Sequence, residues 1–185
     1  MASPPTGTVT FLFTDIEGST RLWEEKPEAM RSALARHDEI LRDAIEANGG
    51  YIFKTVGDAF CAAFDSATDA FEVALAGQRA LLAEDWNEAC VIRVRMALHT
   101  GAVDERGGDY FGPPVNRVAR LLSTGHGGQT LLSLATQELV RDRLPLGTEL
   151  RDMGERYLKD LFRPERIWIS RSLDTDGEFI GAAAY

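Results

Sequence analysis

The sequence has few of the residues that disulfide frameworks and zinc sites require. Its 185 residues include two cysteines, Cys61 and Cys90, whose separated, apolar positions favour reduced, buried side chains over a disulfide or a metal pair. Its three histidines, His37, His99 and His126, show no metal-ligand spacing. We therefore expect neither a disulfide-stabilised fold nor a zinc centre built from cysteine and histidine.

Long apolar runs and an excess of basic residues are also missing. No stretch approaches the length of a membrane span, and the N-terminus lacks the basic-then-apolar pattern of a signal peptide. The net charge of −9 is opposite to the basic surface that general nucleic-acid binding requires. These absences predict a cytoplasmic protein with no membrane span and no nucleic-acid partner. A divalent metal could still let such an acidic protein bind a polyphosphate.

The length and composition are those of one ordinary globular domain. Hydrophobic residues make up 44% of the chain and charged residues 26%. A chain of 185 residues can bury a core of its own without covalent staples. From Arg171 onward the sequence is polar and aperiodic. We predict one folded domain over residues 1–170 and a polar C-terminal tail over residues 171–185.

The stretch F-L-F-T-D-I-E-G-S-T at residues 11–20 predicts a strand that ends in acidic residues. Aromatic and β-branched residues alternate up to Phe13, and two carboxylates, Asp15 and Glu17, follow before Gly18. Carboxylate oxygens suit a hard cation, and the free N–H groups of a helix N-terminus suit an anion. The stretch is therefore a candidate site for a metal-bound phosphate.

A helix is predicted to follow this stretch. A hydroxyl of Ser19 or Thr20 is expected to cap it, and Pro27 is placed in a first turn. The helical pattern ends at Asn48-Gly49-Gly50, and we expect His37 within it to lie on the surface.

The next segment predicts a hairpin that carries two polar residues. The apolar runs 51–56 and 59–64 are separated by Gly57-Asp58, a pattern typical of a tight turn. Asp58 is expected at the tip of this turn. Lys54 interrupts an otherwise apolar strand, which is explained either by a role in a site or by an exposed hairpin face.

The remaining pattern alternates helices and strands. We expect helices at 67–84, 115–123 and 134–143, strands at 92–98 and 129–133, a turn at 106–108, and closing strands or turns at 149–153, 155–161 and 165–169. The order predicts an α+β fold with a ferredoxin-like or palm-type βαββαβ core. In this fold, helices cover one face of a mostly antiparallel sheet.

Polar residues that secondary-structure propensity does not explain point to phosphate chemistry. They are Asp15, Lys54, Asp58, Asp109, Asn116, Arg120 and Lys159. Two carboxylates on neighbouring strands could hold two divalent ions for phosphoryl-type transfer, and an arginine could stabilise charge on the phosphorus oxygens. The residues alone predict a metal-dependent enzyme that acts on a nucleotide or a phosphate ester.

Three motifs in order resemble one known family. They are F-T-D-I-E-G-S-T at 13–20, F-K-T-V-G-D at 53–58, and D-Y-F-G-P-P-V-N-R-V-A-R at 109–120, with L-K-D-L at 158–161 as a less specific addition. From about Thr8 to Ser170 the chain is similar to the catalytic domain of the class III adenylyl and guanylyl cyclases.

The resemblance implies a role for each motif position. Asp15, the Ile16 carbonyl and Asp58 match the ligands of two Mg²⁺ or Mn²⁺ ions, with Gly18, Ser19 and Thr20 as the phosphate-facing turn. Lys54 and Asp109 match the pair that recognises adenine, Asn116 and Arg120 match the residues that orient the ribose and stabilise the transition state, and Lys159 matches a phosphate-binding lysine. Neither Glu17 nor His99 is expected to act as a catalytic base.

The implied reaction converts ATP to 3′,5′-cyclic AMP and pyrophosphate, by in-line attack of the ribose 3′-oxygen on the α-phosphorus. The family works as a head-to-tail dimer whose sites are built from both chains, so the resemblance implies a homodimer. The segment 103–109 is shorter than the dimerisation arm of some relatives, which implies a weak or substrate-dependent dimer.

Two alternatives stay open at the level of sequence. One is a degenerate cyclase-like module that binds nucleotide or dimerises without turnover. The other is a haloacid-dehalogenase-like phosphatase, because D-I-E-G-S-T at residues 15–20 superficially resembles the D-x-D-x-T opening of that family. The phosphatase alternative requires a parallel sheet with alternating helices.

Overall fold

The structure is a computed structural model that describes residues 3–173 and 179–180. Its strands are β1 (Gly7–Ile16), β2 (Tyr51–Val56), β3 (Ala59–Phe64), β4 (Val94–Arg106), β5 (Asp109–Phe111), β6 (Thr130–Ser133), β7 (Thr148–Arg156), β8 (Glu165–Leu173) and β9 (Phe179–Ile180). Its helices are α1 (Ser19–Glu25), α2 (Pro27–Ala47), α3 (Ala67–Ala83), α4 (Pro113–Leu122) and α5 (Leu134–Val140), with a 3₁₀ turn at Arg141–Arg143.

One mostly antiparallel sheet organises the described residues. Its strands lie in the order β2-β3-β1-β4-β6-β8-β7, with β5 paired to β4 and β9 paired to β8. Within the described part of the chain, β4 with β6 is the one parallel pair. This topology confirms the predicted α+β class and contradicts the phosphatase alternative, which requires a parallel sheet.

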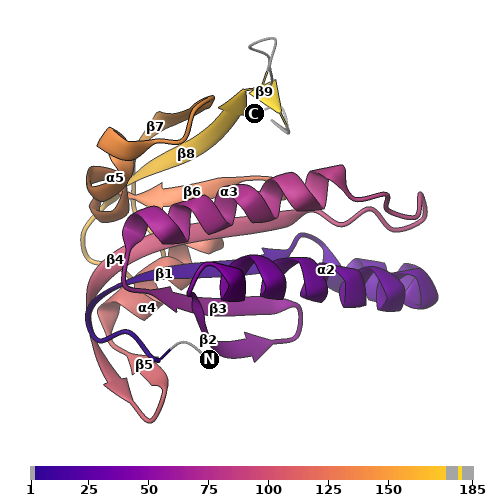
Figure 1. Ribbon diagram of the computed structural model, residues 1–185, viewed down its shortest axis with the longest axis horizontal. Coiled ribbons are helices and arrows are strands. Elements are labelled where there is room, and N and C mark those ends of the chain that lie inside the picture. The colour runs from indigo at the N-terminus through magenta and orange to yellow at the C-terminus, as the bar shows by residue number, and fades with distance from the viewer. Residues whose placement is uncertain (1–2, 174–178, 181–185) are drawn as a thin grey trace.

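The sheet separates two cores, because successive side chains of a strand point to opposite faces. On β1, Leu12 and Ile16 pack into the core beneath α2 and α3, whereas Phe11 and Phe13 pack into the core beneath α4. Figure 1 shows α2 and α3 side by side across one face of the sheet. We had placed the helices on one face, and α4 on the opposite face is the departure from that arrangement. The sequence alone did not place α4, because its apolar stripe fits either face.

Local signals in the sequence set most of the element boundaries. Pro27 is the first residue of α2, and the Oγ atom of Ser66 accepts a hydrogen bond of 3.2 Å from the N–H of Asp69 at the start of α3. Gly57, with a φ of 60°, supplies the tight turn between β2 and β3. Both cysteines are buried and free, as expected.

The predicted surface position of His37 is wrong. Its side chain is fully buried beneath α2 and lies 5.9 Å from the ring of Phe60, measured between ring centroids. Its Nδ1 atom contacts the carboxylate of Asp38 at 2.8 Å. Burial lowers the pKa of His37, because the charged form is poorly solvated there.

The last described strands, β8 and β9, extend beyond the predicted domain boundary at residue 170. Strand β8 continues past residue 170 to Leu173, and β9 pairs with it. Residues 174–178 and 181–185 of the predicted tail lie outside the described residues, so the division at residue 170 stays a prediction. Within the part that the structure describes, no helix is long and apolar enough to cross a membrane.

Candidate active site

The two predicted metal-binding aspartates, Asp15 and Asp58, both lie at the end of β1. The Asp15 side chain is on the same sheet face as Phe11 and Phe13, because it follows them at a period of two. Asp58, at the tip of the β2–β3 hairpin, accepts a hydrogen bond of 2.6 Å at its Oδ2 atom from the backbone N–H of Ile16. The hairpin therefore brings the second carboxylate against the peptide that follows the first.

Arg95 is a site residue that the sequence reasoning missed. It is paired with Asp15 in the register of β1 and β4. Its Nε and Nη2 atoms donate to the two carboxylate oxygens of Asp15, the second at 2.9 Å. In the expected strand at 92–98, Arg93 and Arg95 alternate with apolar residues, a pattern that predicts a half-buried strand with both arginines on its polar face. The period of two was a correct signal, but only the strand register shows that Asp15 lies opposite.

The arrangement fits a pair of divalent cations. Carboxylate and carbonyl oxygens are the preferred ligands of Mg²⁺ and Mn²⁺, and phosphate oxygens of a substrate commonly complete such sites. The two carboxylates and the Ile16 peptide supply these oxygens at one place, and Asp15 already holds a cation there in the form of the Arg95 guanidinium. Among the described residues there is no cluster of three or more His, Cys, Asp or Glu side chains. A metal here therefore needs oxygens from the backbone and the substrate.

The turn after β1 differs in detail from the prediction. Helix α1 begins at Ser19, and its N-cap is Gly18, which has a φ of 69° and makes no side-chain capping bond. The predicted capping by Ser19 or Thr20 is therefore wrong. Since the first N–H groups of a helix have no partner within it, the N–H groups of this turn remain available for hydrogen bonds. Its contact with phosphate stays a prediction.

Lys54 and Asp109 form an ion pair on the α4 side of the sheet. The Lys54 Nζ atom donates to the Oδ2 atom of Asp109 at 2.9 Å, although the residues are 55 positions apart. The hydrogen bond from Lys54, followed by one from the N–H of Tyr110, lowers the pKa of Asp109. Beneath them, burial raises the pKa of the Cys61 thiol to about 11, so this cysteine is inert. The structure thus joins the predicted adenine-recognition pair.

Asn116 and Arg120 lie on the outer side of α4. Pro114, Val118 and Leu121 are buried against the sheet. At 100° per residue, Asn116 and Arg120 project from the opposite side of the helix. They do not face Asp15 and Asp58 of the same chain. An ion pair of Arg117 with the buried carboxylate of Glu165 fixes α4 to the start of β8.

The loop between β7 and β8 carries the last predicted residue. Lys159 is exposed in this loop, and the next residue, Asp160, accepts a hydrogen bond of 2.7 Å from Arg120. Asp160 is the one described non-glycine residue with positive φ, at 62°. Arg156, three positions before Lys159, lies on β7 and lines a cavity.

Glu17 and His99, which are not expected to act as catalytic bases, each contact a side chain of the same chain. Glu17 faces His126 at 3.4 Å. His99 is buried, and its Nδ1 atom contacts the Ser133 Oγ atom at 2.7 Å. Burial, with a smaller contribution from the charge of Arg117, lowers the pKa of His99 to about 4.

Comparisons with other sequences identify relatives of this arrangement. A family model described as the adenylate and guanylate cyclase catalytic domain matches residues 1–169. An uncharacterised protein of Mycobacterium tuberculosis is 45% identical over 94% of this chain and 58% of its own length. An adenylate cyclase of Neurospora crassa is 34% identical over 89% of this chain and 10% of its own length. The chain thus spans little more than half of the first relative and a small part of the second.

Solved structures share the fold over most of their length. An adenylate cyclase of Trypanosoma brucei, analysed in its monomeric state, superposes with a TM-score of 0.82 at 29% identity, covering 91% of this chain and 90% of that one. An adenylyl cyclase from P. aeruginosa gives a TM-score of 0.76 at 26% identity, covering 92% of this chain and 96% of that one.

Proposed function

The chain belongs to the adenylate and guanylate cyclase catalytic domain family, and on this premise we propose that it is an adenylyl cyclase. The proposed reaction converts ATP to 3′,5′-cyclic AMP and pyrophosphate. The ribose 3′-oxygen attacks the α-phosphorus in line, the new P–O bond forms, and the bond to the pyrophosphate oxygen breaks. The whole family includes enzymes for both ATP and GTP, so the choice of ATP rests on residues of this chain.

The observation that carries the proposal is the division of the predicted site residues between two surfaces. Asp15 and Asp58 meet at the end of β1, whereas Asn116 and Arg120 project from the outer side of α4. One chain cannot direct both groups at a single nucleotide. A head-to-tail homodimer can, because a two-fold axis brings the α4 surface of each chain to the β1 end of the other and creates two equivalent sites.

Asp15, Asp58 and the Ile16 carbonyl are the residues that would hold two Mg²⁺ or Mn²⁺ ions. Bound there, the ions would lower the pKa of the ribose 3′-hydroxyl and offset the phosphate charge. The Asp15 carboxylate accepts hydrogen bonds from Arg95, so a cation bound to Asp15 would compete with this guanidinium, and Arg95 would then be able to contact the phosphates of the substrate. The N–H groups of Gly18, Ser19 and Thr20 are proposed to contact the same phosphates.

Lys54 and Asp109 support ATP as the substrate. The Lys54 ammonium can donate to the N1 acceptor of adenine, and the Asp109 carboxylate can accept from the exocyclic amine. Guanine presents the reverse pattern, a carbonyl and a protonated ring nitrogen, to these two groups. Their 2.9 Å ion pair holds donor and acceptor side by side before the base arrives, which reduces the entropy lost on binding.

The remaining residues act on the ribose and phosphates. Asn116 is proposed to orient the ribose by hydrogen bonding, and Arg120 to stabilise the negative charge that develops on the phosphorus oxygens. Lys159, exposed in the β7–β8 loop, is proposed to hold the terminal phosphates. With all of these groups present on each chain, both sites of the dimer would be complete.

A nucleotide-binding module without turnover is the second candidate. Two observations favour it: Asp15 is engaged by Arg95, and Arg120 is engaged by Asp160, so both groups are held within one chain. An enzyme must exchange these partners for metal and phosphate, whereas a binding module need not.

The proposed location is the cytoplasm. The two buried free cysteines suit a reducing compartment.

The deciding experiment incubates the purified chain with ATP or GTP and with Mg²⁺ or Mn²⁺, across a range of protein concentrations. Formation of cyclic AMP from ATP, with a specific activity that rises with protein concentration, supports an adenylyl cyclase that works as a weak dimer. Cyclic GMP as the main product would contradict the assignment of ATP. Nucleotide binding without any cyclic product, at concentrations where the chain is dimeric, would favour the binding module.

A further inference from the structure

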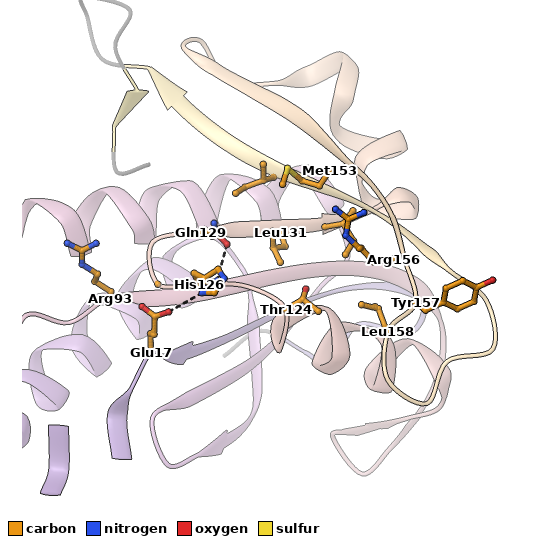
Figure 2. Close-up of a pocket in the computed structure, with 13 residues that line it drawn as sticks. Glu17, Arg93, Thr124, His126, Gln129, Leu131, Met153, Arg156, Tyr157 and Leu158 are labelled. Carbon is orange, nitrogen blue, oxygen red and sulfur yellow. Dashed lines mark hydrogen bonds and ion pairs between the residues drawn. The ribbon is translucent and has the colours of Figure 1, made fainter. Parts of the chain in front are cut away.

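A cavity of about 650 Å³ lies beside α4, away from the Lys54–Asp109 pair. It is enclosed by the end of β1, the loop between α4 and β6, and strands β6, β7 and β8. Figure 2 shows Arg93 and Glu17 toward one end of it, and Arg156 and Tyr157 toward the other. A volume between about 300 and 1,000 Å³ is typical of sites for small organic ligands. The proposed reaction uses none of these side chains.

The floor of the cavity is apolar and belongs to the core beneath α4. It is formed by Leu131, Leu158, Ile167 and Ile169, which are between 3% and 5% exposed. Met153 on β7 extends this apolar lining. Such a floor would contact the hydrocarbon or aromatic body of a ligand, whereas inorganic phosphate would gain nothing from it.

The polar groups at the Glu17 end largely satisfy one another. The Glu17 carboxylate lies 3.4 Å from the Nδ1 atom of His126, and Gln129 accepts a hydrogen bond of 2.9 Å from the backbone N–H of His126. Arg93 lies beside Glu17 because the loop packs tightly over both. A Cβ atom at Gly127 would come within 2.6 Å of Arg93 and 2.7 Å of Glu17. The 2.6 Å contact is with the Cβ atom of Arg93, and the charged partner of Glu17 among the described contacts is His126.

Arg156 lies at the other end of the cavity, and the described contacts pair its guanidinium with no carboxylate. Its Nη1 atom donates to the backbone carbonyl of Glu155 at 3.0 Å. Glu165, its partner in the register of β7 and β8, is turned instead toward Arg117 and the N–H of Leu134. The guanidinium thus projects over an apolar floor with donors to spare, in a chain whose net charge is −9.

We propose that this cavity binds a small amphipathic anion, with the apolar body of the ligand on the floor and its acidic group on Arg156. None of the lining side chains has a role in the proposed nucleotide site. The loop that lines it also packs on the Cβ atom of Arg95, 3.7 Å from the position of a Cβ atom at Gly125, so the two sites are neighbours without sharing side chains.

The test uses a matched pair of fluorescent probes. The first is 1-anilinonaphthalene-8-sulfonate, an aromatic anion, and the second is N-phenyl-1-naphthylamine, which has the same rings and no charge. We expect saturable binding of the anion with one site per chain and a dissociation constant of roughly tens of micromolar. The neutral probe should bind about two- to fivefold more weakly, since it makes no ion pair.

Substitutions of charged residues test which side chain binds the acidic group of the probe. Arg156→Met keeps an apolar stem of similar length, so we expect it to weaken binding of the anion about two- to fivefold and to leave the affinity for the neutral probe unchanged. The control is Arg163→Met, which removes an exposed arginine from the same loop region outside the cavity and should change neither affinity. A Glu17→Gln change removes the one carboxylate of the lining and should strengthen anion binding.

Three results would overturn the proposal. One is binding of the anion that does not saturate or that exceeds one probe per chain, which indicates nonspecific apolar surface. Another is an Arg156→Met variant with unchanged affinity for the anion. The third is displacement of the probe by ATP with Mn²⁺, which would place the cavity in the nucleotide site. Because binding should also survive in Asp15→Ala, this test is independent of whether the chain is a cyclase.

Discussion

The guanidinium of Arg120 donates a hydrogen bond of 2.7 Å to the carboxylate of Asp160, 40 positions away and on the neighbouring β7–β8 loop. Asp160 holds this position with a φ of 62°, a left-handed conformation that aspartate adopts more readily than most residues. The proposed transition-state arginine therefore has a carboxylate partner within its own chain. In the reaction it must exchange this carboxylate for phosphate oxygens of the substrate.

Asp160→Asn is expected to raise kcat about 1.5- to 5-fold. Both side chains are largely exposed, at 40% and 61%, and such exposed pairs contribute between about 0.2 and 1 kcal/mol. Asparagine tolerates the left-handed conformation but removes the competing negative charge. Steady-state kinetics with ATP and Mn²⁺ would measure the effect, and the urea midpoint should stay unchanged. A tenfold fall in kcat would instead mean that Asp160 positions Arg120 for catalysis.

Mixing two inactive variants should restore activity if each site is shared between chains. Asp15→Ala removes a metal ligand, and Arg120→Ala removes the proposed transition-state contact. In a mixed dimer one site carries both defects and the other carries neither. Random mixing of equal amounts should therefore give about one quarter of the wild-type activity.

The control for this experiment pairs Asp15→Ala with Asp58→Ala. Both residues belong to the same side of the proposed site, so every site of the mixed dimer keeps one defect and no activity should return. Recovery with this control pair, or no recovery with Asp15→Ala and Arg120→Ala at concentrations where dimers form, would contradict the shared site.

Lys54→Glu combined with Asp109→Gly should lower the preference for ATP over GTP at least about tenfold in kcat/KM. Glutamate can accept hydrogen bonds from the ring N–H and the amine of guanine, whereas the native lysine can only donate. Competition assays with both nucleotides in one reaction measure the ratio directly. An unchanged ratio of kcat/KM for ATP and GTP would mean that Lys54 and Asp109 do not contact the base. Because Lys54 and Asp109 are partly exposed, the double variant should remain folded.

Much of this arrangement follows from local sequence signals. Gly57-Asp58 specifies the hairpin tip, Pro27 and Ser66 specify helix starts, and the alternation up to Phe13 specifies β1. These signals act over a few residues, so the sequence alone predicts them. The spacing of Asn116 and Arg120 likewise places both on one side of α4.

What the sequence could not predict depends on contacts between distant segments. Arg95 opposes Asp15 only because β1 and β4 pair in one particular register. Histidine is a residue type that is often exposed on a helix. His37 nevertheless faces Phe60, because the orientation of α2 about its own axis turns this side chain toward the sheet. A one-residue change in the register of β1 and β4 would separate Arg95 from Asp15, and a rotation of α2 would separate His37 from Phe60. Neither change would alter the local sequence pattern.

Asp15→Asn should lower cyclase activity on the order of a thousandfold, because the neutral amide binds Mg²⁺ or Mn²⁺ poorly and leaves the phosphate charge uncompensated. Calorimetric titration with Mn²⁺ should show the matching loss of affinity. The control is Glu17→Gln, two positions away, whose carboxylate faces His126 and should keep activity within a few fold of the wild type. Near-normal activity of Asp15→Asn would remove this residue from the metal site.

The free energy of unfolding should decrease as the pH is lowered through the range where His99 is protonated in the unfolded chain. Burial lowers its pKa to about 4 in the folded state, below the ordinary histidine value of 6.5. The unfolded chain therefore binds a proton first as the pH falls, and stability is lost between about pH 6.5 and pH 4. Between pH 7.5 and pH 5.5 this one histidine should cost about 1 kcal/mol. His37, whose pKa is also lowered, should add to the loss of stability.

Urea unfolding of the wild type and of His99→Asn separates the contribution of His99 from that of His37. Asparagine can keep a contact with Ser133 but does not titrate. The variant should lose about 1 kcal/mol less over the same interval, and equal losses would mean that His99 takes up its proton without unfolding.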